Sequence, residues 1–320
     1  MNNCYEFNSV LKDELYNFIN FKRSLGLKYD KRRTRDYKLI DDYWIEHNIT
    51  DIKITREIIN DYIITKNNES PDTYIHRVGA LKQFSFYLNS KGYNDCELFD
   101  VPKVKYKRFI PYIYTSDEII KIIDCIDKSD YENKDQISII IKLLYCTGLR
   151  ISEALNIKFA DISKDITNIV IRNSKNLNTR VIYLSDSIVD ELKNYLSKRY
   201  LKDEDWIFSK NNRQFTVSFV ENFYRKILLQ LGYKKRENGF YPRLHDLRHT
   251  FAVTTLDIMF KKGYDYYNVL PMLSTYMGHK DIKSTEYYIT LTEWLSHETV
   301  EKLNDIYPNV IPVLGGYINE

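Results

Sequence analysis

Apolar residues recur at helical spacing in four segments of the first hundred residues. Thr55 and Ser70 stand at N-cap positions, and Pro71 occupies the first helical position after Ser70. Gly26 and Gly92 lie where the first and last of these patterns stop. We therefore predict a small helical bundle whose inner faces lie within Phe7 to Leu25, Tyr37 to His47, Ile58 to Ile63 and Ile75 to Leu88.

A basic segment separates this bundle from the rest of the chain. Residues 101–113 show no helical period, contain two prolines and carry no acid. We interpret them as a linker between a helical domain over 1–100 and a second domain over 114–295, which a C-terminal tail over 296–320 follows. The linker's cations are Lys103, Lys105, Lys107 and Arg108.

The second domain mixes helical patterns with one clear β signal. Thr115 and Glu118 form a capping box that opens the domain, and an apolar helix is expected over 136–145. Two β-rich runs, 169–172 and 180–184, flank a polar turn and predict a β-hairpin, after which the chain is again mostly helical. The expected fold class is mainly α with a small β-hairpin, which makes it α+β.

Composition excludes some classes of protein. The chain has no run of about 18 apolar residues and no basic-then-apolar leader, so we expect a cytoplasmic protein with no membrane partner. The four cysteines lie far apart and form no CxxC pair, which argues against a disulfide framework and against a thiolate zinc site. With 28 tyrosines in the chain, no single tyrosine stands out by its residue type alone.

The second domain contains the side chains that metal-free transfer of a DNA phosphodiester would need. Such chemistry takes a hydroxyl nucleophile, fixed cations on the non-bridging oxygens and a proton for the leaving oxygen. Arginine suits the cationic role because its planar fork pairs phosphate oxygens, and lysine or histidine suits the proton transfers. The candidates are Arg150 with Glu153 one turn later, Lys175 in the predicted hairpin turn, His245 with Arg248, and His279 before Tyr288.

These segments resemble the sequence boxes of the tyrosine recombinase (phage integrase) family, especially Xer-like and mobile-element integrases. Thr147 to Glu153 matches the pattern T-G-x-R-x-x-E, and His245 to His249 matches H-x-L-R-H. The third box, L-G-H, has Met277 in place of leucine, and Tyr288 follows His279 by nine residues. Each box alone is weak, but three in the family's order between about residues 115 and 303 are highly specific.

The resemblance implies a nucleophile and a phosphate clamp. Tyr288 would attack the scissile phosphate, leaving a 3′-phosphotyrosine and a free 5′-hydroxyl. Arg150 and Arg248 would hold the phosphate oxygens. The phosphotyrosine conserves the energy of the broken bond, so that rejoining to a partner strand would need neither ATP nor a metal, and no cofactor is implied.

The resemblance also implies roles for four supporting side chains. His245 would assist removal of the tyrosine proton, and Lys175 would protonate the leaving 5′ oxygen. His279 would donate a hydrogen bond to a non-bridging oxygen, and Glu153 would support Arg150 from behind. A solvated position at a charged hairpin tip is the ordinary alternative for Lys175.

Two alternatives concern neighbouring residues. His245 and His249 have the i, i+4 spacing of a helical zinc pair, but Asp246 follows the first histidine and Arg248 would set a cation beside the metal. We therefore interpret His249 as a packing residue. Tyr287 is adjacent to Tyr288, and only the nine-residue offset selects the latter, because neighbouring helical positions point about 100° apart.

A second group of cations is predicted to contact DNA. Between residues 22 and 38 the acids are Asp30 and Asp36 alone, and a solvated face is the ordinary explanation of such a run. Beside a phosphate-clamping domain, contact with the DNA backbone is the better interpretation. The predicted DNA-binding residues are Lys22, Arg23, Lys31, Arg32, Arg33 and Arg35, together with the linker cations Lys103, Lys105, Lys107 and Arg108.

The expected partners follow from the resemblance. They are double-stranded DNA with a specific recombination site, enclosed between the core-binding domain (1–100) and the catalytic domain (114–295), and further copies of the chain as a tetramer. A second recombinase or an accessory DNA-bending protein stays open. The tail over 296–320 is expected to dock on a neighbouring protomer, with folding back on its own domain as the alternative.

Two rival functions share these features. A type IB topoisomerase uses a similar set of arginine, lysine, histidine and tyrosine to relax DNA. A non-catalytic DNA-binding accessory protein of a mobile element could keep the same fold. Complete retention of the expected residue types favours the recombinase over the accessory protein.

Overall fold

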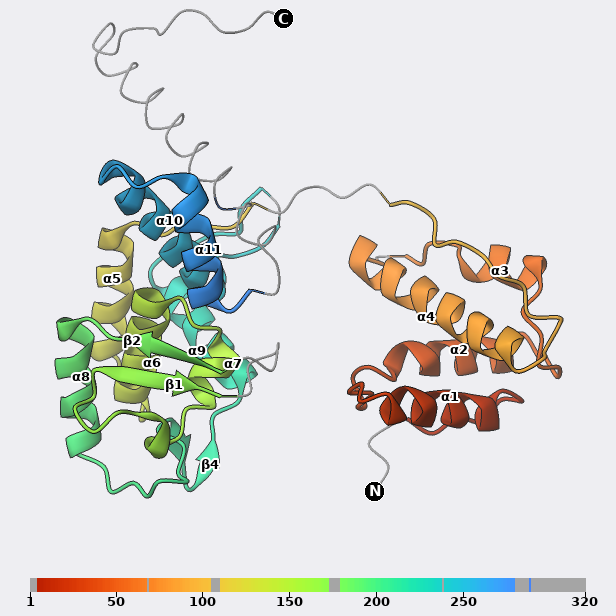
Figure 1. The fold of residues 1–320 in the computed structure, drawn as a ribbon, viewed down its shortest axis with the longest axis horizontal. Helices are drawn as coiled ribbons and strands as arrows, with labels where there is room; N and C mark the ends of the chain where they lie inside the picture. Colours follow the sequence, from red (N-terminus) through yellow and green to blue (C-terminus); the bar gives the residue numbers. More distant parts are fainter. Residues whose placement is uncertain are drawn as a thin grey trace, which may run out of the picture. The chain divides into compact units, whose positions relative to one another are not determined.

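The computed structural model describes residues 5–67, 69–104, 110–172, 179–237, 239–279 and 288. The chain divides into two compact units, Met1–Phe109 and Ile110–Glu320. Figure 1 shows the first unit as helices alone and the second as helices around a small antiparallel sheet. The fold class is therefore mainly α with small β elements, as the sequence pattern predicts.

The first unit consists of four helices around an aromatic core. They are α1 (Lys12–Ser24), α2 (Arg35–Glu46), α3 (Arg56–Tyr62) and α4 (Pro71–Ser90). Phe18, Trp44 and Phe84 are almost fully buried, and the ring of Phe18 meets that of Phe84 edge-on at 5.7 Å between centroids. The side chains of Thr55 and Ser70 accept the predicted capping hydrogen bonds of α3 and α4.

The first helix begins later than its apolar pattern suggests. Phe7 and Leu11 are buried, but α1 begins at Lys12. The backbone amides of Asn8 and Ser9 instead donate to the buried carboxylate of Asp41 on α2, at 2.9 to 3.1 Å. The amides of Asn8 and Ser9 are therefore bound to Asp41 instead of forming an earlier turn of α1.

A buried arginine joins α3 to α4. Arg77, whose side chain is 1% exposed, donates through Nε and Nη2 to the carboxylate of Glu69, both at 2.7 Å. Its guanidinium also donates to the carbonyls of Tyr62 and Ile64 at the end of α3. This guanidinium therefore satisfies the carbonyls of one helix while neutralising a buried acid before the next helix.

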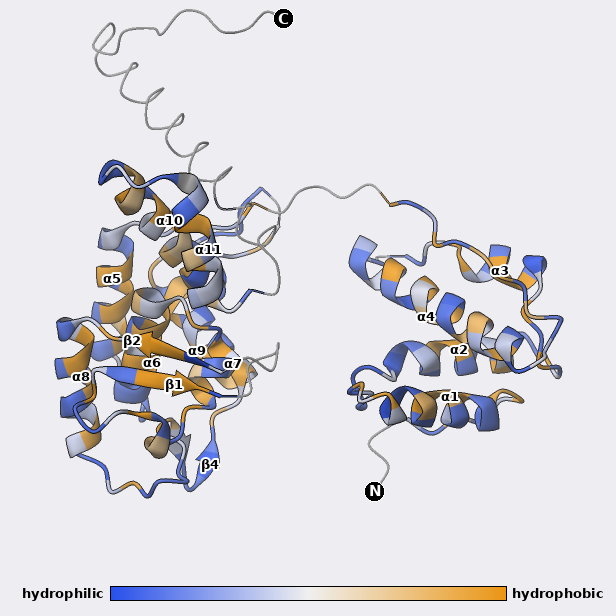
Figure 2. Ribbon diagram, viewed as in Figure 1, coloured by the Kyte–Doolittle hydropathy of each residue, from blue (hydrophilic) through white to orange (hydrophobic). Residues whose placement is uncertain are grey.

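The second unit is built around one apolar helix, α6 (Lys134–Thr147). Ile137, Ile140 and Ile141 are fully buried on it, and it packs against α5, α8 and α10. Figure 2 shows apolar residues along these central elements and on the sheet. The remaining elements are α5 (Ser116–Asp127), α7 (Ile151–Leu155), η1 (Phe159–Asp161), α8 (Asp186–Ser197), α9 (Val217–Gln230), α10 (Asp246–Lys261) and α11 (Tyr266–Met277).

The predicted β-hairpin is formed by β1 (Asn168–Ile171) and β2 (Arg180–Tyr183). The strands pair antiparallel, with Ile169 opposite Ile182 and both side chains fully buried. A second pair of short strands, β3 (Ser209–Lys210) and β4 (Arg213–Gln214), lies before α9. The capping box of Thr115 and Glu118 forms at the start of α5.

Cys96, Cys125 and Cys146 carry free thiols. Among the described residues, no helix is long and apolar enough to cross a lipid bilayer.

The buried pair in the first unit yields a stability prediction. Arg77→Met should reduce the free energy of unfolding of this unit by about 3–5 kcal/mol, because Glu69 (5% exposed) would keep a buried, unpaired charge. Hydrogen-exchange protection of the α3 and α4 amides in the full chain measures this loss.

Arg56 provides the matched control, because its pair with Glu97 is 60% and 42% exposed. Arg56→Met should cost roughly 0–1 kcal/mol. Equal losses of protection in the two variants would show that burial of the Arg77–Glu69 pair is unimportant.

Candidate active site

The turn after α6 places Arg150 at the start of a new helix. Gly148 ends α6 with φ +62°, and Arg150 caps α7 in an extended conformation. A Cβ on Gly148 would lie 2.3 Å from the ring of Phe251 on α10. Glycine is therefore required here both for the backbone conformation and for the close approach of α10.

Glu153 orients Arg150 from one turn further along α7. The Arg150 amide donates to Glu153 Oε2 at 3.0 Å, and Arg150 Nη1 donates to Oε1 at 2.9 Å. Burial raises the pKa of Glu153, but the hydrogen bonds from Arg180 and Arg150 outweigh it, so that this pKa lies below its usual value. Glu153 therefore stays ionised at neutral pH and fixes the guanidinium.

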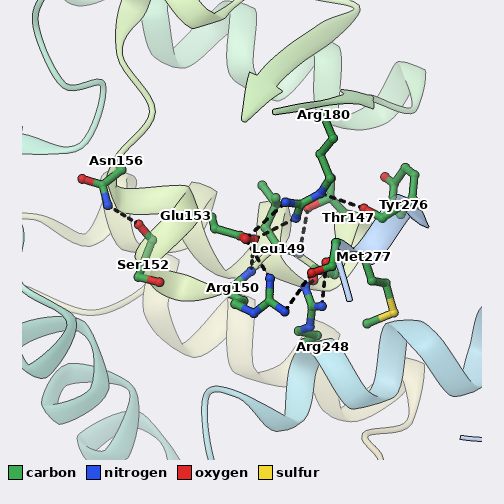
Figure 3. Close-up of polar contacts among 12 residues, drawn as sticks. Thr147, Leu149, Arg150, Ser152, Glu153, Asn156, Arg180, Arg248, Tyr276 and Met277 are labelled. Atoms are coloured by element: carbon green, nitrogen blue, oxygen red, sulfur yellow. Dashed lines mark hydrogen bonds and ion pairs between the residues drawn. The ribbon is translucent and has the colours of Figure 1, made fainter. Parts of the chain in front are cut away.

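Three arginines hold the C-terminal end of α11 (Figure 3). Arg180 Nε donates to the Tyr276 carbonyl at 2.8 Å, and Arg248 Nη2 donates to the Met277 carbonyl at 2.8 Å. Arg150 Nη2 donates to the Gly278 carbonyl at 3.2 Å. These are carbonyls that a helix end leaves without intrahelical donors, and the partial negative charge of the helix C-terminus favours cations there.

The turn that ends α11 is held by the backbone as well. Gly278 has φ +67°, its amide donates to the Thr275 carbonyl, and the His279 amide donates to the Ser274 carbonyl at 3.0 Å. This is the Schellman pattern of helix termination. Together with the three arginines it determines where the segment toward His279 leaves the helix.

Arg248 is the most deeply buried cation of this group. It is 2% exposed, and its Nη1 also donates to the Gly148 carbonyl at 2.6 Å. Burial and the neighbouring Arg150 lower its pKa to about 10, while the nearby Tyr288 phenol acts in the opposite direction. Arg248 therefore remains protonated at neutral pH and bridges the α6 turn to the end of α11.

His245 and His249 lie at the start of α10 with their rings nearly perpendicular, 5.0 Å between centroids. Part of His245 is accessible to solvent, but the surrounding protein removes the rest from water. This desolvation lowers the pKa of His245 to about 4, with further contributions from Arg248, Arg243 and Arg150. Burial, His245 and the arginines lower the pKa of His249 to about 3. Both imidazoles are therefore neutral at pH 7, so that either ring can accept a proton.

The surroundings of these histidines bear on the zinc alternative. Arg248 depresses the pKa of both rings, which means that a cation already acts on the space a metal would occupy. Within the described ranges, no three histidine, cysteine, aspartate or glutamate side chains gather in a way that could hold a metal ion.

Tyr288 is buried beside the histidines. It is 3% exposed and belongs to the apolar cluster of α10 and α11 that includes Leu256 and Leu273. Its ring lies 5.5 Å from that of His249 and 6.2 Å from that of His279, measured between centroids. The side chain of Tyr287 lies outside the described residues, so the choice between the two tyrosines stays a prediction.

The structure brings together most of the predicted site. Direct hydrogen bonds join Arg150 to Glu153, and Arg150 and Arg248 hold neighbouring carbonyls of one turn. The ring of His249 lies next to those of His245 and Tyr288, and the ring of His279 lies next to that of Tyr288. Lys175 lies outside the described residues, and the chemical roles assigned to all these side chains stay predictions.

The predicted DNA-binding residues divide by exposure. Arg23 donates to the Tyr29 carbonyl and Lys22 lies over the Phe18 ring, so both also support the fold of the first unit. The residues that project into solvent are Lys31, Arg32, Arg33, Arg35 and Lys103, whereas Lys105, Lys107 and Arg108 lie outside the described residues.

Arg180 is the residue of this site that sequence reasoning missed. In the sequence it stands out only as a cation near Lys175, whereas its guanidinium lies in the centre of the polar cluster in Figure 3. Residue type alone gives no signal for it, because the burial of Glu153, which explains a second cationic donor, is known only from the structure.

Sequence comparisons identify relatives over much of the chain. The model of the phage integrase family matches residues 113–294. The integrase/recombinase y4rB of Sinorhizobium fredii is 26% identical over 309 residues, which is 92% of this chain and 97% of the relative. The tyrosine recombinase XerH of Campylobacter jejuni is 28% identical over 71% of this chain and only 57% of the relative. XerA of Pyrococcus furiosus is 29% identical over 71% and 72%.

Structure comparisons show the same fold in two integrase complexes. A lambda integrase (75–356) dimer bound to a COC′ core site has a TM-score of 0.61 at 19% identity, covering 85% of this chain and 96% of the other. The Tn1549 transposon integrase in complex with transposon right-end DNA has a TM-score of 0.61 at 14% identity, covering 92% and 100%.

The depressed histidine pKa yields a prediction on pH-dependent stability. In the fold the pKa of His249 is about 3, below its ordinary value of 6.5, so the unfolded chain binds a proton that the folded chain excludes. This contribution to stability is complete above pH 6.5 and is lost as the pH falls toward 3. His249→Gln removes it, so between pH 7 and pH 5 the Tm of the variant should fall less than that of the wild type.

Tm values from pH 5 to pH 8 test this. Between pH 7 and pH 8 the two proteins should show the same pH dependence, because the imidazole is neutral in both the folded and the unfolded chain. Parallel curves below pH 6.5 would mean that folded His249 takes up the proton freely.

Proposed function

The chain belongs to the phage integrase family and is therefore an enzyme of the tyrosine recombinase type; we propose that it exchanges DNA strands at a specific site through a covalent bond to Tyr288. The observation that carries this proposal is the convergence of Arg150, Arg248, His245 and His279 on the surroundings of one buried tyrosine. These residues come from three separate segments of the second unit, and a buried cationic cluster without an anionic function would be costly to maintain.

The charge of the cluster suits a phosphodiester. Arg150, Arg180 and Arg248 bring three positive charges, and Glu153 returns one negative charge. The site therefore offers an excess of two positive charges in a partly dehydrated setting. Such preorganised charge stabilises the additional negative charge of a pentacoordinate phosphorus transition state.

The proposed cleavage step exchanges one ester oxygen on phosphorus for another. The Tyr288 hydroxyl loses its proton to neutral His245 and its oxygen bonds to phosphorus, while the bond from phosphorus to the 5′ oxygen breaks. Lys175 gives a proton to that leaving oxygen, and the products are a 3′-phosphotyrosyl linkage and a 5′-hydroxyl. His279 donates a hydrogen bond to a non-bridging oxygen. Attack by a 5′-hydroxyl from the partner duplex reverses the step and joins the exchanged strands.

No metal or nucleotide is required by this scheme. The guanidiniums supply the charge stabilisation, and the phosphotyrosine retains the energy of the broken phosphodiester. The pKa of His245, about 4, keeps its ring unprotonated near neutral pH, as a proton acceptor must be.

We propose that the chain acts on DNA as a tetramer. Exchange between two duplexes requires cleavage at four strand positions, and each chain supplies one Tyr288. The proposal is supported by two solved complexes of lambda integrase, which is a dimer on a core site in one and a tetramer on a Holliday junction in the other. A docking role for the tail over 296–320, which lies outside the described residues, belongs to the same proposal.

The two units would divide the work. The second unit carries the chemistry, and the helical unit over 1–100 with the linker over 101–113 would contact the DNA backbone. Support comes from the exposed cations Lys31, Arg32, Arg33 and Arg35, which follow one another closely from the segment after α1 to the first residue of α2.

The nucleophile is tested by paired tyrosine substitutions. On a nicked suicide substrate, Tyr288→Phe should bind DNA but form no covalent adduct, because the attacking oxygen is gone. Tyr287→Phe, the matched control, should still form the adduct. Denaturing gels of the trapped complexes report the result, and an adduct from Tyr288→Phe together with none from Tyr287→Phe would reverse the assignment.

The backbone interactions are tested by salt dependence. Replacing Arg32, Arg33 and Arg35 together by glutamine should weaken binding similarly on specific and unrelated DNA. It should also flatten the dependence of log Kd on log salt by about one unit for each phosphate that the protein no longer neutralises. The control is Lys53→Gln, since Lys53 is paired with Asp51 at 3.0 Å. An unchanged slope in the triple variant would mean that the three arginines lie on an ordinary solvated surface and do not contact the DNA backbone.

A further inference from the structure

Arg180 stands at the first position of β2, five residues after Lys175 in the sequence. Its side chain is only 9% exposed. The guanidinium donates through Nη1 and Nη2 to the two carboxylate oxygens of Glu153, at 3.2 and 2.8 Å, and through Nε to the Tyr276 carbonyl at 2.8 Å (Figure 3). One side chain of the hairpin therefore contacts both α7 and the end of α11.

The Glu153 carboxylate has two donors on each oxygen. Oε1 accepts from Arg150 Nη1 at 2.9 Å and from Arg180 Nη1 at 3.2 Å. Oε2 accepts from the Arg150 amide at 3.0 Å and from Arg180 Nη2 at 2.8 Å. A carboxylate with this donor set has a single orientation, so the direction of the Arg150 fork depends on Arg180 as well as on Glu153.

The guanidinium of Arg180 also lies against the backbone of the turn before His279. A Cβ on Gly278 would lie 2.8 Å from Arg180 Nη1 and 3.1 Å from Cζ. The φ of +67° at Gly278 is also a backbone conformation that residues with a side chain adopt only at an energetic cost. The close approach limits how the Gly278 turn and the hairpin can move relative to one another.

We propose that Arg180 is a positioning residue that aligns Arg150 through Glu153 and ties the Lys175-bearing hairpin to the end of α11. The proposal rests on the proposed function, because the alignment matters to the extent that Arg150 and Lys175 act on a scissile phosphate. Arg180 itself is not assigned a contact with DNA.

Electrostatics supports the same role. After burial, which raises the pKa of Glu153, the hydrogen bond from Arg180 is the largest influence on this carboxyl, and it lowers the pKa. Removal of Arg180 should raise the pKa of Glu153 and make its protonation reachable in mildly acidic solution. Protonated Glu153 would lose one acceptor position and with it part of its hold on Arg150.

The hairpin provides a matched control. Arg172 follows β1 on the other side of the same turn and pairs with Asp161 at 2.6 Å, but its side chain is 59% exposed. It has the same charge and a carboxylate partner, and that partner lies on η1 rather than on α7 or α11. Arg172→Met therefore repeats the loss of charge near the turn without removing the link to Glu153.

The kinetic test measures single-turnover adduct formation on the nicked suicide substrate with saturating full-length protein. Arg180→Met should slow adduct formation by about 10- to 100-fold, because a misplaced clamp loses most of its benefit. The Kd for DNA should change by less than about threefold. Arg180→Lys should recover part of the rate, since it keeps the charge but cannot bond both carboxylate oxygens as a fork. Arg172→Met should match the wild type.

The pH profile separates positioning from general loss of structure. Arg180→Met should lose rate toward acid more steeply than the wild type, because the raised pKa of its Glu153 lets the carboxyl take up a proton at higher pH. Combining Arg180→Met with Glu153→Gln should remove this additional acid limb. A uniform fall at all pH values would contradict the proposed route through Glu153.

A measurement without DNA tests the link independently of activity. The Tm difference between the wild type and Arg180→Met should be largest at neutral pH and shrink as the pH falls, because Glu153 takes up a proton first in the variant, where its pKa is raised, and only at lower pH in the wild type. In a Glu153→Gln background the same substitution should change Tm less and without this pH dependence.

The outcomes distinguish the two proposals. A wild-type protein that forms no adduct contradicts the proposed function, and the Tm measurement still decides whether Arg180 holds Glu153. A wild-type protein that forms adduct, together with an Arg180→Met variant of equal rate and unchanged pH profile, overturns the role of Arg180 alone. A Tm difference independent of pH and of Glu153 overturns the link itself.

Discussion

The second unit depends on one constraint: the carbonyls at the C-terminal end of α11 have no donors within their own helix. Arg180, Arg248 and Arg150 provide those donors, one for each of the three carbonyls from Tyr276 to Gly278. The constraint is structural, since buried carbonyls must be hydrogen-bonded. Its result is chemical, because satisfying it with guanidiniums gathers positive charge at the turn that leads to His279 and Tyr288.

Such a concentration of like charge must be balanced before any substrate arrives. Glu153 supplies a full negative charge between Arg150 and Arg180, and the helix end supplies a partial one. Arg248 donates to the carbonyls of Gly148 and Met277, which are neutral acceptors, and this agrees with its lowered pKa of about 10. Since one carboxylate cannot neutralise three guanidiniums, the remaining charge is available to an anion. The side chains that hydrogen-bond the carbonyls at the end of α11 are therefore the same ones that offer positive charge to a phosphate.

The sequence predicted the parts of this arrangement that are carried by side-chain patterns. The T-G-x-R-x-x-E segment indicated both the turn at Gly148 and the pairing of Arg150 with Glu153, and the hairpin strands follow from their β-rich runs. The sequence could not predict the position of Arg180. One of its acceptors is the main-chain carbonyl of Tyr276, and every residue has such a carbonyl whatever its type. The late start of α1 and the burial of Arg77 have the same cause. In both cases a contact between distant segments, with Asp41 or with the end of α3, overrides the local pattern.

The arginine hydrogen bonds to α11 also affect the order in which the site can assemble. They join positions 128, 96 and 29 residues apart, and all three acceptors lie in the last part of the described unit. Closing such long loops is slow compared with forming local helices. The three cations precede residues 276–278 in the chain and are synthesised first, with Glu153 as the nearby acid that pairs with two of them. A nascent chain must therefore tolerate an electrostatic conflict that α11 relieves, so the arginine cluster can mature only after α11 has formed.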